Sequence, residues 1–215
     1  MVNIENKNVF ISCACTYPKD MTIFPAATRF AQLLETIKSC EHIDDHINII
    51  AEASELSESE KNSIKENAIL FEFYNDEDVK NASFNKQLGS IMLWIKLLNN
   101  ITFESDDTNV FFLSGRYVLN ESFKLENYHG DFVYKNHWYD THRGGWYGTQ
   151  LFMIKSSQKD VFIKMLQESI LKISNGEAQD IECALYQALS LYAVTELEEV
   201  GCNGLLGIAG INSYH

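Results

Sequence analysis

The sequence predicts an α/β fold in which a mostly parallel sheet is flanked by helices. Short apolar runs of strand-forming residues alternate with longer segments in which apolar residues recur at helical spacing. Such alternation is typical of parallel sheets, because a helix usually connects two parallel strands. The 215 residues, 46% of them hydrophobic, suffice for one sizeable core, and no proline-rich or serine-rich linker divides them. We therefore expect one domain over residues 1–215, whether or not it is the N-terminal part of a longer polypeptide.

The central strand of this sheet is predicted at residues 109–113. Its sequence, Asn-Val-Phe-Phe-Leu, lacks polar alternation, which indicates a strand that is covered on both faces. Four further strands are predicted at residues 9–15, 47–53, 68–74 and 150–154. Helices are predicted at residues 25–40, at 85–98 and after the segment 176–182, where apolar residues recur at helical spacing. A helix at 57–67 is predicted from the capping chemistry and early carboxylates of residues 57–60, and another helix is predicted at 158–173.

The central strand ends on Ser114, Gly115, Arg116 and Tyr117. In open α/β sheets, ligands bind outside the carboxyl ends of the strands. Glycine there lets a ligand approach the backbone, and the arginine fork suits a phosphate or a carboxylate. Ser114, Gly115 and Arg116 are therefore candidate contacts to an anionic ligand, although a plain turn with a surface arginine is the alternative.

The first predicted strand is followed by a second group of candidates, namely Cys15, Thr16 and Tyr17. Small residues there would let a flat base lie against the backbone, and the tyrosine ring could stack on it. Arg29 lies near the start of a predicted helix, where a cation opposes the helix dipole, which hints at an anionic partner. Lys86 lies in the first turn of another helix and could reach a diphosphate. A plain connection and solvated cations are the alternatives.

A metal site is predicted at Asp76 and Asp78, which follow the predicted strand 68–74. One bend of the chain can aim both carboxylates at one point, as in pairs that hold Mg²⁺ or Mn²⁺ against substrate phosphates. The alternative is an acidic surface turn, which is common in so acidic a chain.

Residues 137–149 form an unusual run that combines three glycines, four aromatic residues, two histidines and an aspartate. Its glycines argue against a helix, and its rings and polar groups suit a sugar-binding loop. A metal site formed by His137 and His142 lacks supporting spacing. Asp140, His142 and Asp180 are candidates for contacts to a sugar or for taking up the acceptor's proton. Glu182 is an alternative to Asp180, although a carboxylate in the first turn of a helix needs only the dipole to explain it.

The chain carries a formal net charge of −13, which argues against a nucleic-acid or anionic-membrane surface. Its five cysteines form no Cys-x-x-Cys pair, and we expect reduced thiols in a reducing compartment, the cytoplasm. The polar first seven residues predict no signal peptide, and no apolar segment approaches the roughly 20 residues that span a bilayer.

The element order, the Asp-x-Asp pair, the Ser-Gly-Arg-Tyr segment and the late aromatic-glycine loop together resemble the GT-A glycosyltransferases, whose fold is Rossmann-like. The chain is similar in particular to the glycosyltransferase domains that modify the major capsid protein of chlorella viruses. The resemblance implies a nucleoside-diphosphate-sugar donor, often a UDP-sugar, a divalent cation, Mn²⁺ or Mg²⁺, and a glycan or glycoprotein acceptor. It also implies a hexose or deoxyhexose as the transferred group, and the cytoplasm of a host cell if the protein is viral.

One departure from the GT-A pattern concerns the cation. In most members the Asp-x-Asp pair follows the strand that here ends in Ser-Gly-Arg-Tyr, whereas Asp76 and Asp78 come one strand earlier. Either this pair supplies the metal from a shifted position or Arg116 partly substitutes for the cation. Two rival hypotheses remain, a sugar nucleotidyltransferase and a non-catalytic carbohydrate-binding or assembly module. The first would normally show a glycine-rich loop after the first strand, which residues 13–20 lack.

Overall fold

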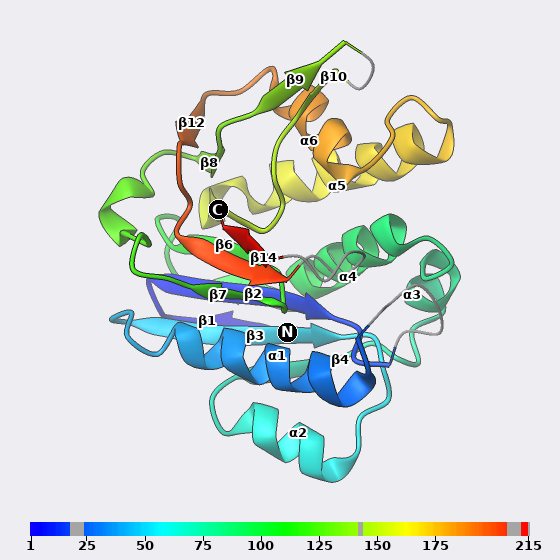
Figure 1. Ribbon diagram of the computed structural model, residues 1–215, viewed down its shortest axis with the longest axis vertical. Helices are drawn as coiled ribbons and strands as arrows, with labels where there is room; N and C mark the ends of the chain where they lie inside the picture. Colours follow the sequence, from blue (N-terminus) through cyan, green and yellow to red (C-terminus); the bar gives the residue numbers. More distant parts are fainter. Residues whose placement is uncertain (18–23, 142–143, 206–211, 215) are drawn as a thin grey trace.

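A seven-stranded sheet with strand order β12-β8-β11-β6-β2-β3-β4 forms the centre of the protein (Figure 1). The computed structural model describes residues 1–17, 24–141, 144–205 and 212–214. Strand β11 is antiparallel to both of its neighbours, and the other pairings in this sheet are parallel. The seven strands are β2 (Asn8–Ala14), β3 (His46–Glu52), β4 (Ile69–Glu72), β6 (Asn109–Leu113), β8 (Phe132–Lys135), β11 (Leu151–Lys155) and β12 (Val194–Leu197). The predicted α/β fold with a mostly parallel sheet is confirmed.

Helices cover both faces of this sheet (Figure 1). Ile50 of β3 packs with residues of α1 (Ala26–Ser39) and α2 (Glu58–Lys65). The neighbouring Ile49 points to the opposite face, whose apolar cluster includes residues of the other long helices. These are α4 (Lys86–Asn100), α5 (Lys159–Ser174) and α6 (Ile181–Leu189), and the short helix α3 (Glu77–Ala82) precedes α4.

Three small sheets complete the described fold. Strand β1 (Val2–Ile4) pairs with β5 (Ile101–Phe103), and β9 (Trp138–Asp140) forms a hairpin with β10 (Gly144–Trp146). The third sheet has the order β14-β13-β7 and lies beside the segment that follows β6 (Figure 1). Its strands are β7 (Tyr117–Leu119), β13 (Cys202–Leu205) and β14 (Asn212–Tyr214), and two 3₁₀ turns are η1 (Leu125–Asn127) and η2 (Ser156–Gln158).

Strand β6 is buried on both faces, as its sequence predicts. Phe111 stacks on Phe10 with ring centroids 4.6 Å apart, and Phe112 stacks on Phe152 at 4.7 Å on the opposite face. Both phenylalanines of β6 are at most 1% exposed. Strand β6 lies in the middle of the seven-stranded sheet, between β2 and β11. The Ser-Gly-Arg-Tyr segment therefore begins at the midpoint of the edge that the strand ends form.

The predicted helices and strands are present within a few residues of their expected bounds. The capping chemistry expected before α2 is a complete capping box, in which Ser57 and Glu60 exchange hydrogen bonds. The segment 137–149 is not a loop throughout, because it contains the hairpin β9–β10. The short strands of the three small sheets and two strands of the central sheet, β8 and the parallel edge strand β12, were not predicted from the sequence.

All five cysteines lie within the described residues and are free thiols. None of the helices in the described residues has the length and apolar character needed to cross a bilayer.

Candidate functional site

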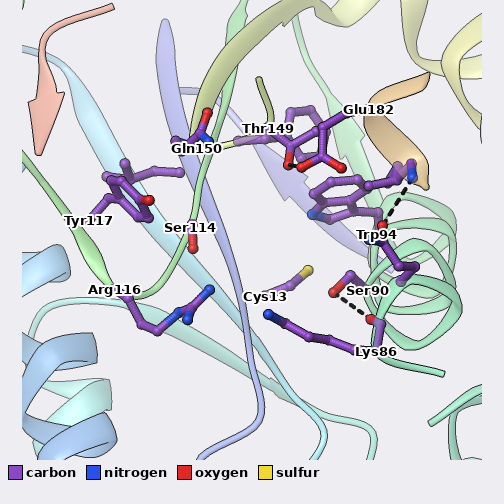
Figure 2. Close-up of a pocket in the computed structure, with 14 residues that line it drawn as sticks. Cys13, Lys86, Ser90, Trp94, Ser114, Arg116, Tyr117, Thr149, Gln150 and Glu182 are labelled. Atoms are coloured by element: carbon purple, nitrogen blue, oxygen red, sulfur yellow. Dashed lines mark hydrogen bonds between the residues drawn. The ribbon is translucent and has the colours of Figure 1, made fainter. Parts of the chain in front are cut away.

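A pocket of about 320 Å³ opens where β2 and β6 end (Figure 2). Cys13 near the end of β2, Phe112 and Leu113 of β6, and the segment that follows β6 form part of its wall. The other walls come from the first half of α4, the turn before β11 and the first turn of α6. The carboxyl ends of β2 and β6 face the pocket, which is where ligands bind in open α/β sheets.

One end of the pocket is cationic. The side chains of Lys86 and Arg116 come from α4 and from the segment after β6, and they point toward each other across the pocket (Figure 2). Within the described part of the chain, neither side chain makes a hydrogen bond or an ion pair. Burial lowers the pKa of both groups, and so does repulsion, because Arg116 and Arg29 act on Lys86 and Arg29 acts on Arg116. An anion would relieve this repulsion.

Arg29 contributes to the same positive potential from the first turn of α1. Its Nε donates a hydrogen bond of 3.0 Å to the backbone oxygen of Cys15. This contact joins the start of α1 to the loop after β2, and it holds the arginine close enough to act on both pocket cations.

The opposite end of the pocket carries a carboxylate and a hydroxyl. Thr149 Oγ1 donates a hydrogen bond of 2.9 Å to Glu182 Oε1, and Trp94 lies beside this pair (Figure 2). Trp94 is held by edge-to-face contacts with Phe112 and Phe152 at 5.5 and 5.6 Å between ring centroids. A carboxylate, a hydroxyl and an aromatic ring are the groups that bind the hydroxyls and the apolar face of a sugar.

The stability of the protein should reflect the burial of Glu182. Burial raises the pKa of its carboxyl above the ordinary 4.5, repulsion from Asp180 adds to this, and the Thr149 hydrogen bond and the Lys86 charge oppose it. From pH 4.5 up to the raised pKa, the folded state binds more protons than the unfolded state, so stability falls as the pH rises through this window.

We therefore expect Glu182→Gln to lose this part of the pH dependence. Urea unfolding of both proteins over a pH series would measure it. The free energy of unfolding of the variant minus that of the wild type should increase as the pH rises from 4.5. A constant or shrinking difference would contradict the assignment.

A buried carboxylate, Glu52, organises the loop after β2. Glu52 is 0% exposed and lies at the end of β3. Its Oε1 accepts hydrogen bonds from the backbone N–H groups of Thr16 (3.0 Å) and Ser54 (2.8 Å), and its Oε2 accepts one from Thr16 Oγ1 (2.8 Å). The loop after β2 is therefore fixed to the loop after β3.

The candidates Cys15, Thr16 and Tyr17 lie in this loop but do not line the pocket. The Thr16 side chain is buried and bonded to Glu52. Tyr17 is 47% exposed, and its hydroxyl donates a hydrogen bond of 2.6 Å to Glu60. Cys15 accepts a weak hydrogen bond from Ser54 Oγ at 3.6 Å, and burial raises the pKa of its thiol. Stacking of the exposed Tyr17 ring on a base stays a prediction.

Gly115 allows the segment after β6 to pack closely against α1. Its φ angle is not in the left-handed region, and an added Cβ would lie 3.2 Å from Leu33 Cδ1 of α1. The absence of a side chain lets the segment after β6 lie against α1 between the pocket residues Ser114 and Arg116.

The structure places Asp76 and Asp78 away from this pocket. They follow β4, which is three strand positions from β6, or about 14 Å at about 4.8 Å per strand. Both carboxylates bind Lys96 Nζ, at 3.0 and 2.6 Å. Lys96 lies ten residues after Lys86 in α4, a distance of about 15 Å along the helix axis.

Both carboxylates of this pair already have partners in the protein. Asp76 caps α3 by accepting hydrogen bonds from the N–H groups of Asp78 and Val79, at 3.0 and 3.1 Å. Burial alone would raise the pKa of Asp76, but the hydrogen bonds from Lys96 and Val79 outweigh it and lower the pKa. Among the described residues, no three His, Cys, Asp or Glu side chains are arranged to hold a metal ion. Metal binding at Asp76 and Asp78 stays a prediction, and it would require a cation to displace Lys96.

The three residues predicted to act on the sugar or the acceptor have different positions. Asp180 caps α6 by accepting a hydrogen bond of 2.9 Å from Cys183 N, and it does not line the pocket. Its neighbour Glu182 lines the pocket instead. The backbone of Asp140 pairs with Gly144 in the hairpin β9–β10. His142 lies outside the described residues. The structure therefore brings Lys86, Ser114 and Arg116 to the pocket from the predicted set.

The hairpin β9–β10 presents aromatic side chains to solvent. Trp138 is 41% exposed and Tyr139 is 70% exposed. Trp146 of β10 supports Trp138 from the paired strand, with 5.9 Å between ring centroids. His137 lies beside Glu196, 2.8 Å from its carboxylate. Sugar binding by this segment stays a prediction, and the segment reaches the pocket through Thr149.

Two groups of pocket residues were missed by the sequence analysis. The first consists of Ser90 and Trp94 of α4, which follow the predicted Lys86 at intervals of four residues and so share its helix face. That spacing is visible in the sequence. The second consists of Thr149 and Gln150, which precede the antiparallel strand β11, and their position depends on a strand direction that the sequence does not reveal.

Comparison with known proteins gives similarity in structure only. No family model and no curated protein match the sequence. The galactosyltransferase LgtC, solved with donor and acceptor sugar analogs, superimposes with a TM-score of 0.56 at 14% identity, over 87% of this chain and 72% of LgtC. The PaToxG glycosyltransferase gives a TM-score of 0.52 at 10% identity, over 87% of this chain and 69% of its own. The glycosyltransferase GlyE of Streptococcus pneumoniae TIGR4 gives 0.50 at 10% identity, over 90% of this chain and 46% of GlyE. The chain shares the GT-A-like fold of these solved glycosyltransferases.

Proposed function

We propose that this protein is a glycosyltransferase that uses a nucleoside-diphosphate sugar as its donor. The observation that carries the proposal is the polarity of the pocket: two cations without protein partners among the described residues face a carboxylate, a hydroxyl and an indole ring. A sugar diphosphate has the matching polarity, with an anionic end and a hydroxyl-bearing end. The shared fold with solved glycosyltransferases supports the same function.

In this proposal the diphosphate lies between Lys86 and Arg116, and the sugar lies against Trp94 with hydroxyls on Glu182 and Thr149. The pocket volume of about 320 Å³ is at the lower end of the range for small-molecule sites. It therefore suits the sugar and the diphosphate, while the base would extend toward the loop that carries Tyr17. We take a UDP-linked hexose or deoxyhexose as the donor, and a hydroxyl of a glycan or glycoprotein as the acceptor. Modification of a viral capsid protein stays a prediction from the resemblance.

The reaction breaks the bond between the anomeric carbon and the oxygen of the β-phosphate. The electron pair of this bond leaves with the nucleoside diphosphate, which gains one negative charge. The acceptor oxygen forms the new bond to the anomeric carbon and releases its proton. Cations positioned at the departing diphosphate stabilise the transition state, because negative charge develops there. Asp140, Asp180 and His142 stay predictions for groups that contact the acceptor or take up its proton.

Turnover of nucleotide sugars tests the proposal. The protein would be incubated with UDP-, GDP- and CMP-linked sugars, with and without a mixture of glycan acceptors, and the released nucleotide would be measured. We expect release of UDP from a UDP-sugar, with Glu182→Gln slower than the wild type by about 100-fold or more. Glu168→Gln, an exposed change on α5, is the matched control.

Two other outcomes would reject the proposal. Formation of a nucleotide sugar from a sugar phosphate and a nucleoside triphosphate, with release of pyrophosphate, would indicate a nucleotidyltransferase. Binding of glycans without turnover or binding of any nucleotide would indicate a carbohydrate-binding module.

A further inference from the structure

The resemblance to GT-A enzymes implies metal-binding aspartates directly after the central strand, where this chain has Ser114, Gly115 and Arg116. These residues follow β6, which lies beside β2 in the middle of the sheet. The side chain at this position that enters the pocket with a charge is a guanidinium, which repels a divalent cation. A metal ion held here by the protein would therefore lie beside a positive charge.

The second cation comes from α4, which packs on the face of the sheet that carries Phe112. Lys86 begins α4 after the N-cap Asn85, whose side chain accepts hydrogen bonds from Gln87 N and Leu88 N. The first turn of α4 contains no acidic residue, so the usual charge preference of a helix start is reversed. Capping by Asn85 fixes the direction of the helix, and Lys86 extends from it toward Arg116 (Figure 2).

In the absence of a ligand, Arg116 repels Lys86 across the pocket. They face each other in a partly buried pocket, and Arg29 repels both of them. By contrast, the acidic pair that could hold a metal is satisfied by Lys96 and by the start of α3. Within the described residues, the two pocket cations thus make no ion pair, whereas the carboxylates of Asp76 and Asp78 are both paired with Lys96.

We infer that Lys86 and Arg116 neutralise the diphosphate of the donor themselves, so that this protein binds nucleoside diphosphates without a divalent cation. The inference rests on the proposed function and adds how the leaving group is stabilised. Arg116 binds phosphate oxygens through its planar fork, and Lys86 supplies a second charge from the facing wall. The nucleoside diphosphate that departs with the extra electron pair is stabilised by the same two groups.

Titration calorimetry with UDP measures this directly. Wild-type protein would be titrated once in buffer with EDTA and once with Mn²⁺. We expect binding in both, with dissociation constants within about threefold of each other. Lys86→Met and Arg116→Met should each weaken binding by about tenfold or more in EDTA. Lys38→Gln, which removes an exposed cation from α1, should leave the dissociation constant unchanged.

The thermal stability of Lys86→Met separates a ligand-binding role from a structural one. Methionine keeps the length of the apolar stem and removes a charge whose burial and repulsion by Arg116 and Arg29 outweigh its attraction to Glu182. The ligand-free variant should therefore melt at a higher temperature than the wild type although it binds UDP more weakly. A lowered melting temperature would mean that Lys86 holds the fold together, and would overturn its assignment to the ligand.

Different experimental results would reject this inference and the proposed function. If UDP binds only with Mn²⁺, and Asp76→Asn or Asp78→Asn abolishes that binding, the inference is overturned while a metal-dependent transferase remains. If UDP binds under neither condition and no nucleotide sugar is turned over, the proposed function itself is rejected.

Discussion

Replacing Glu52 with alanine should lower the free energy of unfolding by about 3 kcal/mol or more, because several buried donors lose their acceptor together. The backbone N–H groups of Thr16 and Ser54 and the hydroxyl of Thr16 all bond to this carboxylate. Both Thr16 and Ser54 are buried, so water cannot readily replace the lost acceptor. Urea unfolding followed by circular dichroism measures the change.

Two further variants make this prediction sharper. Glu52→Gln should retain most of the stability, because Glu52 Oε1 alone accepts both backbone N–H groups and the Thr16 hydroxyl can accept from an amide. Glu55→Ala, an exposed change three residues away, should stay within about 0.5 kcal/mol of the wild type. A loss of less than 1 kcal/mol in Glu52→Ala, or an equal loss in Glu55→Ala, would show that the loop does not depend on this carboxylate.

Loss of Glu52 should also affect the pocket. The loop that it fixes carries the Cys15 carbonyl to which Arg29 donates, and Arg29 acts on both pocket cations. Glu52→Ala should therefore bind UDP more weakly than the wild type at a temperature where both proteins are folded.

Gly204→Ala is expected to lower both stability and UDP affinity. Gly204 of β13 is the register partner of Tyr117 in β7. An added Cβ would collide with the Arg116 backbone oxygen and would lie 2.8 Å from Tyr117 Cγ. Overpacking of this kind costs about 1–3 kcal/mol, and relief requires the Arg116–Tyr117 segment to move. Thermal unfolding and UDP titration of the variant would measure the two effects.

Gly89→Ala in α4 provides the contrast. A Cβ at Gly89 would have ordinary contacts, of which the nearest is 3.5 Å from Ser83 Cα. Because alanine is preferred to glycine inside a helix, this variant should gain about 0.5–1 kcal/mol. If Gly204→Ala were as stable as the wild type and bound UDP equally well, the close packing of β13 on Arg116 would have no part in forming the site.

The fold was predictable from the sequence because its signals are local. The unbroken apolar run at β6 required burial on both faces, and the structure buries it between aromatic layers. The helices have apolar faces, and the capping residues Ser57 and Glu60 indicate where α2 begins. The short strands escaped prediction because each depends on a partner far away in the chain. Strand β7, for example, pairs with β13 more than 80 residues later.

The candidate site was predictable in part, for the same reason. Arg116 and Lys86 could be proposed because the ends of parallel strands and the starts of the helices beside them gather at one sheet edge. The same rule could not show that Asp76 and Asp78 lie away from that pocket. It says at which ends of the strands ligands bind, but it does not say how far the strand before Asp76 lies from β6 in the sheet. The structure puts β4 at the edge and gives the pair Lys96 as a partner. Glu52 went unnoticed because a buried acid at the end of a strand looks like any other acid in so acidic a chain.

The crystal structure of the protein soaked with UDP in the presence of EDTA tests the central claim most directly. The account predicts the diphosphate between Lys86 Nζ and the guanidinium of Arg116, at the ends of β2 and β6. A diphosphate bound beside Asp76 and Asp78, or nucleotide density anywhere that leaves these two cations without an anion, would contradict it.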